Sequence, residues 1–254
     1  GPVSLRGGFS AKEFRCDGGT GTVTVMWEAG STSTVRELVT QGTSALTNVV
    51  FRSTSPGSRW KLKVTGYDCV KGTDVQDSDA SPGEPVYPMY SRDSGNNTNW
   101  FFGSPWATWL GTNSSDFGTA GNWSPASVPD ADTRVLVEST NAMIIATPTA
   151  VREIILGDGP GQAFVQANEV LDVRDDVTVR TNGTLVAVKP VTVTNDILLL
   201  DGGGMTHPAN AASDIYSLRV TAGGNFTADA LSRFDVTQRG YDGYGGPGPA
   251  IDNV

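Results

Sequence analysis

The residues best suited to metal chemistry are aspartates that lie beside short apolar segments. Asp172, Asp175 and Asp176 fall in one short stretch of the chain. Carboxylate oxygens and turn carbonyls are the ligands that calcium prefers. The Asp-x-Asp-x-Asp-Gly pattern of an EF-hand is absent. The three aspartates are therefore candidate ligands for a calcium site of another kind, solvated turn residues are the favoured interpretation, and no other cofactor is indicated.

Basic residues offer a second chemistry, the removal of a proton beside a sugar carboxylate. A polysaccharide lyase needs a Lys or Arg for this step, with the acid neutralised by a cation such as calcium. Arg180 and Lys189 are the candidates, provided that they lie on neighbouring turns; outward-facing solvated charges are the alternative. His207 is the only histidine, so neither a Ser-His-Asp triad nor a histidine-rich metal site is indicated.

Aromatic side chains offer a third possibility, stacking against sugar rings. Four tryptophans fall within a short span: Trp100, Trp106, Trp109 and Trp123. A flat ring buries much area at a low cost in conformational entropy. We expect Trp100 and Trp106 to contact glycans, and the other two to cap one end of a repetitive fold. Tyr241 and Tyr244 lie in a Gly/Pro-rich run and are further candidates for contact with a glycan or other partner.

The charge and composition narrow the range of partners. The chain carries 18 basic and 27 acidic residues, for a net charge of −9. Such a chain repels a phosphate backbone, and no basic stripe offsets this, so nucleic acid is not an expected partner. No run of about 18 apolar residues occurs, so no transmembrane helix is predicted. Few lysines and abundant Thr, Asn and Gly favour an extracellular or cell-surface location.

Cys16 and Cys69 are the only cysteines, and they lack zinc-site spacing. In an exported protein, two cysteines favour one disulfide, with two buried thiols as the alternative. A bridge between them would close a loop of about 50 residues and stabilise a small module by roughly 4 kcal/mol in the chain-entropy account.

The elements that must position these residues are strands. Residues 22–27 and 59–67 alternate apolar and polar side chains as half-buried strands do, and residues 49–52 form another candidate. We predict a small disulfide-closed β-sandwich-like module, similar to an immunoglobulin or fibronectin domain, over residues 8–79. Prolines and small polar residues over 80–99 predict a linker.

From residue 100 onward the apolar segments are short and closely spaced. Five of them begin at Leu171, Val177, Leu185, Val191 and Ile197. Turn dipeptides such as Asn182-Gly183 separate them. Strands of this kind are typical of a solenoid. We predict an all-β chain in which residues 100–254 form an N-terminal cap and the first coils of a right-handed parallel β-helix.

Two stretches of sequence resemble a known group of proteins. TWLG at 108–111, GNWS at 121–124 and VPD at 128–130 are similar to the opening motif of bacterial exported and cell-surface parallel β-helix proteins. These include adhesin-like and autotransporter-passenger-like chains. The run from FDV at 234–236 to GPGP at 246–249 is similar to a later stretch of such proteins. Phe117 stands where that group often has Trp, and the resemblance covers residues 108–250 only.

The resemblance implies a secreted or cell-surface adhesin-like protein that binds glycans or assembles with copies of itself. This leading interpretation is not catalytic. One alternative is the N-terminal part of a polysaccharide lyase or glycoside hydrolase of β-helix fold. Another is a structural subunit of an extracellular fibre. Acidic or basic residues gathered on one face of consecutive turns would favour the enzyme, and the sequence offers only scattered members.

Overall fold

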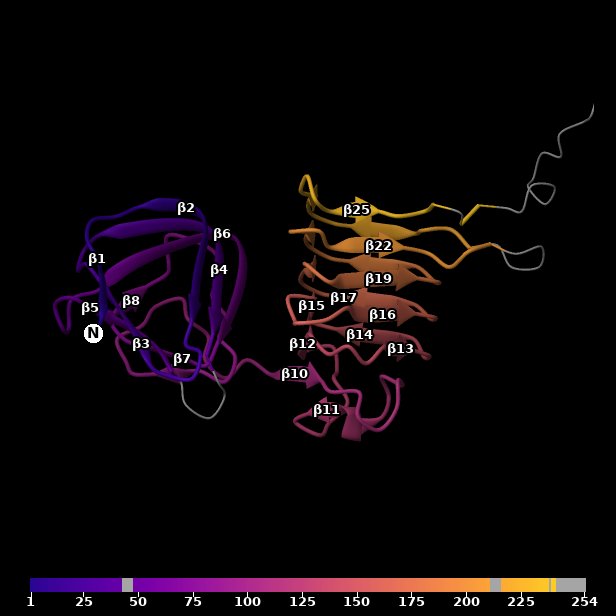
Figure 1. The fold of residues 1–254 in the computed structure, drawn as a ribbon, viewed down its shortest axis with the longest axis horizontal. Helices are drawn as coiled ribbons and strands as arrows, with labels where there is room; N and C mark the ends of the chain where they lie inside the picture. Colours follow the sequence, from indigo (N-terminus) through magenta and orange to yellow (C-terminus); the bar gives the residue numbers. More distant parts are fainter. Residues whose placement is uncertain (43–47, 211–215, 238, 241–254) are drawn as a thin grey trace, which may run out of the picture. The chain divides into compact units, whose positions relative to one another are not determined.

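A computed structural model describes residues 1–42, 48–210, 216–237 and 239–240. The chain divides into two compact units, Gly1–Ser104 and Pro105–Val254 (Figure 1). Strands supply nearly all of the regular structure, and most strand pairs are parallel. The prediction of an all-β chain is therefore confirmed.

The first unit contains two parallel sheets, which the chain visits alternately. Sheet A has the order β1 (Val3–Leu5), β3 (Val23–Trp27), β5 (Val49–Ser53), β7 (Thr73–Val75) and β9 (Arg92–Asp93). Sheet B has the order β2 (Ser10–Asp17), β4 (Thr32–Gln41), β6 (Trp60–Lys71) and β8 (Ser78–Asp79). Each strand after β2 thus pairs with the strand two positions earlier in the chain.

The predicted immunoglobulin- or fibronectin-like sandwich is wrong for this unit, because such modules are built from antiparallel strands. Here β3 and β5 are parallel, with Val25 opposite Phe51. Between two neighbouring strands of one sheet, the chain passes through a strand of the other sheet. That strand is the crossover connection that parallel pairing requires. Side chains alternate with a period of two in both arrangements, so the sequence pattern could not distinguish them.

An aromatic cluster fills the space between the two sheets. Trp27 and Trp60 stack with ring centroids 4.5 Å apart and planes inclined by 9°. Phe51 meets both indoles edge-on. Aromatic pairs of this kind contribute about 0.5–1.5 kcal/mol beyond the area they bury. Leu62 and Val64 follow Trp60 on the same buried face of β6, as the alternation of residues 59–67 predicts.

No disulfide joins Cys16 and Cys69, so the predicted bridge is wrong. Cys16 pairs with Thr40 of β4, whereas Cys69 pairs with Val39 of the same strand. The two cysteines are therefore two strands apart, roughly 9–10 Å at normal strand spacing. Their side chains also leave opposite faces of sheet B. Since a disulfide needs Cα atoms within about 7 Å and side chains that face each other, the register excludes the bridge.

Residues 80–99, predicted as a linker, belong to the first unit. β9 lies within them and extends sheet A beside β7. Val86 is fully buried and forms a parallel bridge with Trp100. The prolines of this segment therefore mark irregular backbone within a folded unit, and the division between units falls after Ser104.

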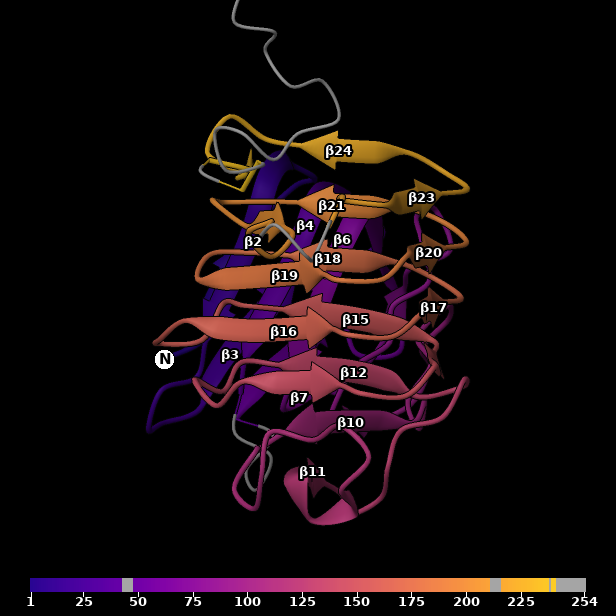
Figure 2. The same ribbon diagram turned by 90° about the vertical axis from the view of Figure 1, so that its right-hand side faces the viewer.

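The second unit contains three sheets, which the chain visits in turn. Sheet C has the order β11 (Trp123–Ser124), β10 (Trp106–Trp109), β12 (Arg134–Val137), β15 (Glu153–Leu156), β18 (Val177–Val179), β21 (Ile197–Leu199) and β24 (Phe226–Ala228). Sheet D has β13 (Met143–Ile145), β16 (Ala163–Ala167), β19 (Gly183–Ala187), β22 (Gly204–Thr206) and β25 (Arg233–Phe234). Sheet E has β14 (Thr149–Val151), β17 (Leu171–Val173), β20 (Val191–Val193) and β23 (Val220–Ala222). Figure 2 shows the strands of sheet C from β10 to β24 as successive layers.

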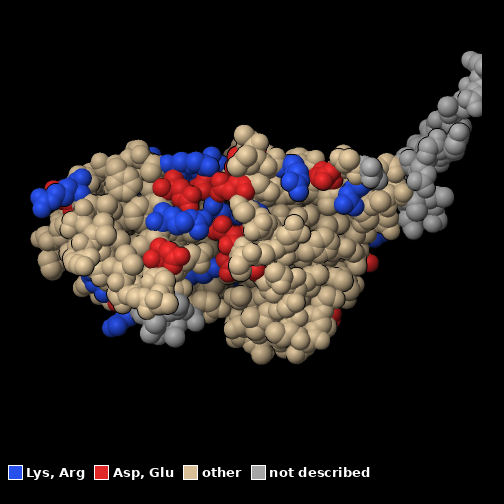
Figure 3. Space-filling model, in the orientation of Figure 1, with Lys and Arg blue, Asp and Glu red and all other residues tan. Residues whose placement is uncertain are grey.

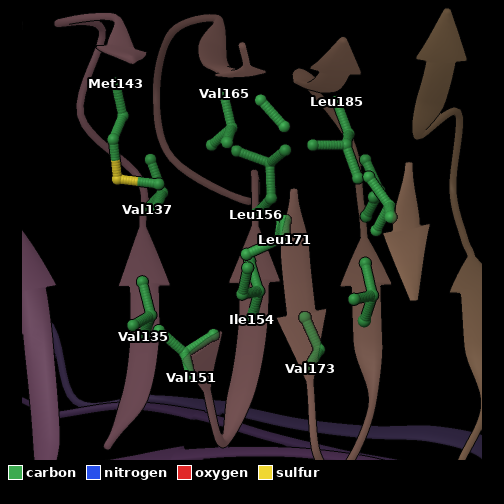
Figure 4. Close-up of a cluster of buried hydrophobic side chains, with 14 of the residues drawn as sticks. Val135, Val137, Met143, Val151, Ile154, Leu156, Val165, Leu171, Val173 and Leu185 are labelled. Carbon is green, nitrogen blue, oxygen red and sulfur yellow. The ribbon is translucent and has the colours of Figure 1, made fainter. Parts of the chain in front are cut away.

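Ladders of aliphatic side chains fill the space between these three sheets. Val135, Ile154, Val177 and Ile197 are successive register partners along sheet C. None of them is more than 1% exposed. Figure 4 shows Val135 and Ile154 with Val151 of sheet E, all directed into the same interior. The short apolar segments of the sequence are thus the inward-facing steps of these ladders.

The turns predicted from Asp-Gly and Asn-Gly dipeptides lie where the chain leaves the strands of sheet C and passes to sheet D. Asp158, Asn182 and Asp201 have φ values of 69°, 64° and 54°. Asn and Asp tolerate this left-handed region better than other L residues, because their short side chains bond locally. A Cβ on Gly203 would lie 2.1 Å from the carbonyl oxygen of Val179. Close stacking of the turns therefore requires glycine at that position.

An antiparallel strand closes the start of the second unit. β11 pairs with β10 in the opposite direction, and the short 3-10 helix η1 (Ala120–Asn122) leads into it. Trp109 and Trp123 meet edge-on with ring centroids 4.9 Å apart, and both are fully buried. Their indole N–H groups donate to the carbonyl oxygens of Asn141 and Phe117. This is the end of the unit at which the sequence predicted a cap.

Candidate functional site

An outward-facing pair of aromatic rings on the first unit is the best candidate site for a sugar. Val86 and Trp100 form a parallel bridge and pack into the core of that unit. The next residues, Tyr87 and Phe101, point outward, because successive side chains of extended backbone alternate. Their rings stack with centroids 5.2 Å apart and planes inclined by 24°. Phe101 is 48% exposed and Tyr87 is half-buried.

Hydrogen bonds hold the Tyr87–Phe101 pair on its frame. The Phe101 amide donates to the carbonyl oxygen of Val86 at 2.9 Å. The Tyr87 amide donates to the carboxylate of Asp68 at 3.2 Å. The rings therefore need little reordering to accept a flat apolar ligand face, which lowers the entropic cost of binding.

Trp100, predicted to contact glycans, is buried. It is 8% exposed, and its indole N–H donates to the hydroxyl of Ser78 at 2.9 Å. Its ring also stacks on Phe102, with centroids 6.0 Å apart. The indole therefore offers no open face to a sugar, and its role is to fill the core of the first unit.

Trp106, the other tryptophan predicted to contact glycans, lies on β10 and is half-buried. It is the register partner of Arg134 on β12, on the opposite face of the strand from Ala107 of the core. Tyr241 and Tyr244 lie outside the described residues.

The three aspartates predicted to bind calcium are not grouped as ligands. Asp172 is exposed on β17 of sheet E, where its register partners are Ala150 and Thr192. Asp175 accepts hydrogen bonds from Arg134 and Arg152, each at 2.9 Å. Across the described ranges, no three His, Cys, Asp or Glu side chains form a group that could hold a metal ion.

Ion pairs instead join successive layers near the beginning of the strands of sheet C. Arg134 pairs with both Glu153 and Asp175, and Arg152 pairs with Asp175. Burial raises the pKa of the neighbouring Asp176 carboxyl, and a hydrogen bond from the amide of Asp196 only partly offsets this. The negative charges of Asp196 and Asp175 raise that pKa further. Glu153 and Asp175 thus link successive layers through ion pairs, whereas the charge of Asp176 is disfavoured in the folded chain.

Arg180 and Lys189, the candidates for a lyase base, lie in different settings. The Arg180 side chain is 1% exposed, and its guanidinium lies 2.7 Å from the Asp201 carboxylate and 3.7 Å from that of Asp158. A guanidinium between two carboxylates stays protonated, so it cannot accept a proton. Lys189 is exposed in the turn that follows β19, on another sheet. The structure does not bring the two together.

His207 is buried after β22, where its ring Nδ1 lies 2.7 Å from the carbonyl oxygen of Pro208. This contact engages one ring nitrogen with the neighbouring backbone.

Sequence reasoning missed the Tyr87–Phe101 pair. Tyr87 falls in the segment assigned as a linker, and Phe101 stands between two other aromatic residues. The available signal was the alternation through Trp100, Phe101 and Phe102, which assigns the middle ring to the opposite face from its neighbours. Alternation alone does not say which of the two faces is buried, and the bridge between Val86 and Trp100 decides it.

Comparison with known proteins adds no assignment: no family model, no curated protein and no solved structure matches this chain. None of the helical segments in the described ranges is long and apolar enough to cross a membrane.

Proposed function

We propose that this chain is a secreted or cell-surface adhesin-like protein that binds glycans at the Tyr87–Phe101 pair. The observation that carries the proposal is the stacked, outward-facing pair itself, held beside the parallel β-bridge between Val86 and Trp100. Rigid aromatic faces bury the apolar face of a sugar ring at little entropic cost. The resemblance of residues 108–250 to exported bacterial proteins supports an extracellular or cell-surface location.

We also infer that residues 105–236 form the start of a right-handed parallel β-helix. Each strand of sheet C from β15 to β24 pairs in parallel with the strand three positions earlier, and the two other sheets repeat the pattern. Connections between parallel strands of one sheet are right-handed in about 98% of cases, which supports the hand. Such a stack presents long rigid faces, which suit a polymeric ligand.

A polysaccharide lyase or glycoside hydrolase is less well supported. A lyase needs an unprotonated base that can accept the proton from the sugar. The guanidinium of Arg180 is held between Asp158 and Asp201, so it does not supply one. Lys189 remains as an exposed base without Arg180 beside it. A fibre subunit is also compatible with stacked parallel strands, but the aromatic pair favours a binding role.

A glycan array probed with the whole chain tests the proposal. We expect retention on a subset of glycans, with binding reduced at least tenfold by Phe101→Ala and preserved by Phe101→Tyr, which keeps an aromatic face. Leu110→Ala, at another exposed apolar residue, serves as the matched control and should bind as the unaltered chain does. No binding to any glycan, or equal losses in Phe101→Ala and Leu110→Ala, would overturn the proposed site.

The same samples distinguish the enzyme alternative. Bound polysaccharides are assayed for unsaturated or reducing ends released with time. Product release would replace the binding proposal with a catalytic one and direct attention to Lys189.

A further inference from the structure

Asn182 is the only asparagine in the sequence that is followed by glycine. In such a pair the backbone nitrogen of the glycine can attack the carboxamide carbon of the asparagine, because glycine has no Cβ to shield that nitrogen. An N–C bond forms, the carboxamide C–N bond breaks, and ammonia leaves with the proton of the backbone amide. Water then opens the cyclic imide, which leaves either aspartate or isoaspartate at position 182.

The attacking group, the Gly183 amide, is held in the folded chain. It donates to the carbonyl oxygen of Arg180 at 2.8 Å. Gly183 is buried as the first residue of β19, and a Cβ there would lie 2.6 Å from the carbonyl oxygen of Leu156. The attack requires that the amide proton be removed, and a buried, hydrogen-bonded amide gives up its proton only when the backbone opens locally.

The Asn182 side chain is also engaged, although the residue is exposed. Its carboxamide nitrogen donates to the carbonyl oxygen of Gly159 in the preceding turn at 3.2 Å. Its backbone carbonyl accepts the Ala163 amide at 2.8 Å, and its φ is 64°. The carboxamide and the Gly183 amide thus each bond to another group, and both have to be released before they can react.

Isoaspartate does not fit the closed turn. It lengthens the backbone by one carbon atom between its Cα and Gly183. Gly183 lies against Leu156 of the preceding turn and is the register partner of Ala163, so the longer backbone would shift β19 out of register with β16. Aspartate keeps the backbone length but has no N–H to donate to Gly159, and therefore weakens the turn without displacing the strand.

Both products also carry a new carboxylate beside two acidic residues. The backbone carbonyl of Thr181 accepts the Asp158 amide, and its hydroxyl donates to the carbonyl oxygen of Asp201. Arg180 already pairs with both of their carboxylates. The strands β13, β16, β19 and β22 contain no charged residue, and Figure 3 shows few charges over the face of the second unit where Figure 1 places them. Repulsion by like charges therefore adds to the loss of fit.

We propose that Asn182–Gly183 is a site of spontaneous deamidation that the stacked turns keep closed, and that a turn carrying isoaspartate does not close again. The modification therefore accumulates in chains whose second unit has opened, and it retains them in the open state. This goes beyond the proposed function and does not depend on the Tyr87–Phe101 pair, so the failure of either leaves the other standing.

Peptide mapping by mass spectrometry tests the closed state. The full chain is incubated in mildly alkaline buffer with and without urea, and circular dichroism checks which samples are folded. We expect deamidation at Asn182 to be at least tenfold slower in the folded chain than in the unfolded chain. In urea, Asn113, which precedes Ser114, should react more slowly than Asn182. Equal rates at Asn182 in the two states, or a faster reaction at another asparagine in urea, would overturn the proposal.

Refolding of the incubated chain tests the effect of isoaspartate. Urea is removed, the folded fraction is separated by size-exclusion chromatography, and fragmentation in the mass spectrometer distinguishes isoaspartate from aspartate. We expect isoaspartate at position 182 to be at least tenfold depleted in the folded fraction. Asn182→Gly is the matched control, since glycine accepts the same φ and has no carboxamide, and its recovery should not fall with incubation. Isoaspartate in equal amounts in both fractions, or an equal loss of recovery in Asn182→Gly, contradicts the proposal.

Discussion

Trp100 and Phe101 are consecutive in the chain, yet their rings lie on opposite sides of the backbone. Trp100 is 8% exposed and Phe101 is 48% exposed. The bridge between Val86 and Trp100 fixes which of the two points inward. Trp100 therefore fills the core while Phe101 faces solvent, and substitutions at the two positions should have different effects on stability.

We expect Trp100→Ala to lower the free energy of unfolding of the first unit by about 3–5 kcal/mol, since it leaves a cavity and removes a hydrogen bond to Ser78. Phe101→Ala should cost less than about 1 kcal/mol, because the ring is half in solvent. Urea denaturation followed by fluorescence and circular dichroism measures both. Similar losses in the two variants would contradict the assigned orientation.

Arg180 forms ion pairs with Asp158 in the preceding turn of the stack and with Asp201 in the following turn. Arg180→Met should destabilise the second unit by about 3–5 kcal/mol, since it leaves two partly buried carboxylates without their cation. Arg174→Met is the control, because its pair with Asp132 is largely exposed and contributes about 0–1 kcal/mol. Chemical denaturation compares them, and equal effects would show that Arg180 does not hold these turns.

Asp176 gives a pH-dependent prediction. Burial raises the pKa of its carboxyl in the folded state, so ionisation of this group opposes folding. The penalty is complete above the folded pKa and disappears as the pH falls to the unfolded value, near 3.9. Asp176→Asn keeps an oxygen to accept the Asp196 amide and should raise the melting temperature at pH 7, with no gain below about pH 4.

Thermal melts at the two pH values test this prediction, with Asp172→Asn on the exposed face of β17 as the control that should change neither. A lower melting temperature for Asp176→Asn at pH 7 would mean that the carboxylate charge stabilises the turn.

Because no disulfide joins Cys16 and Cys69, we expect reductants to leave the stability of the chain unchanged. The melting temperature should be the same with and without dithiothreitol, whereas loss of a real bridge across this loop would cost roughly 4 kcal/mol. Burial raises the pKa of the Cys16 thiol, and the charge of Asp17 adds to the effect, so alkylation at Cys16 should be slow in the folded chain. Mass spectrometry after unfolding should find both thiols alkylated without prior reduction.

Local pattern in the sequence was enough to predict much of the second unit. Short apolar segments became the inward steps of ladders such as Val177 and Ile197, because a parallel stack repeats the same side chain position in each layer. Asp-Gly and Asn-Gly dipeptides became the turns at Asp158, Asn182 and Asp201, because these residues tolerate positive φ. Both signals act within a few residues.

The sequence by itself determined that this chain is all-β, where its turns lie, and which residues of a strand share a face. Only the tertiary structure decided that the first unit is parallel, that Cys16 and Cys69 leave opposite faces of sheet B, and that Phe101 rather than Trp100 meets solvent. The physical reason is the same each time. Alternation fixes two faces of a strand but not which one is buried or which strand lies beside it, and register between distant segments makes that choice.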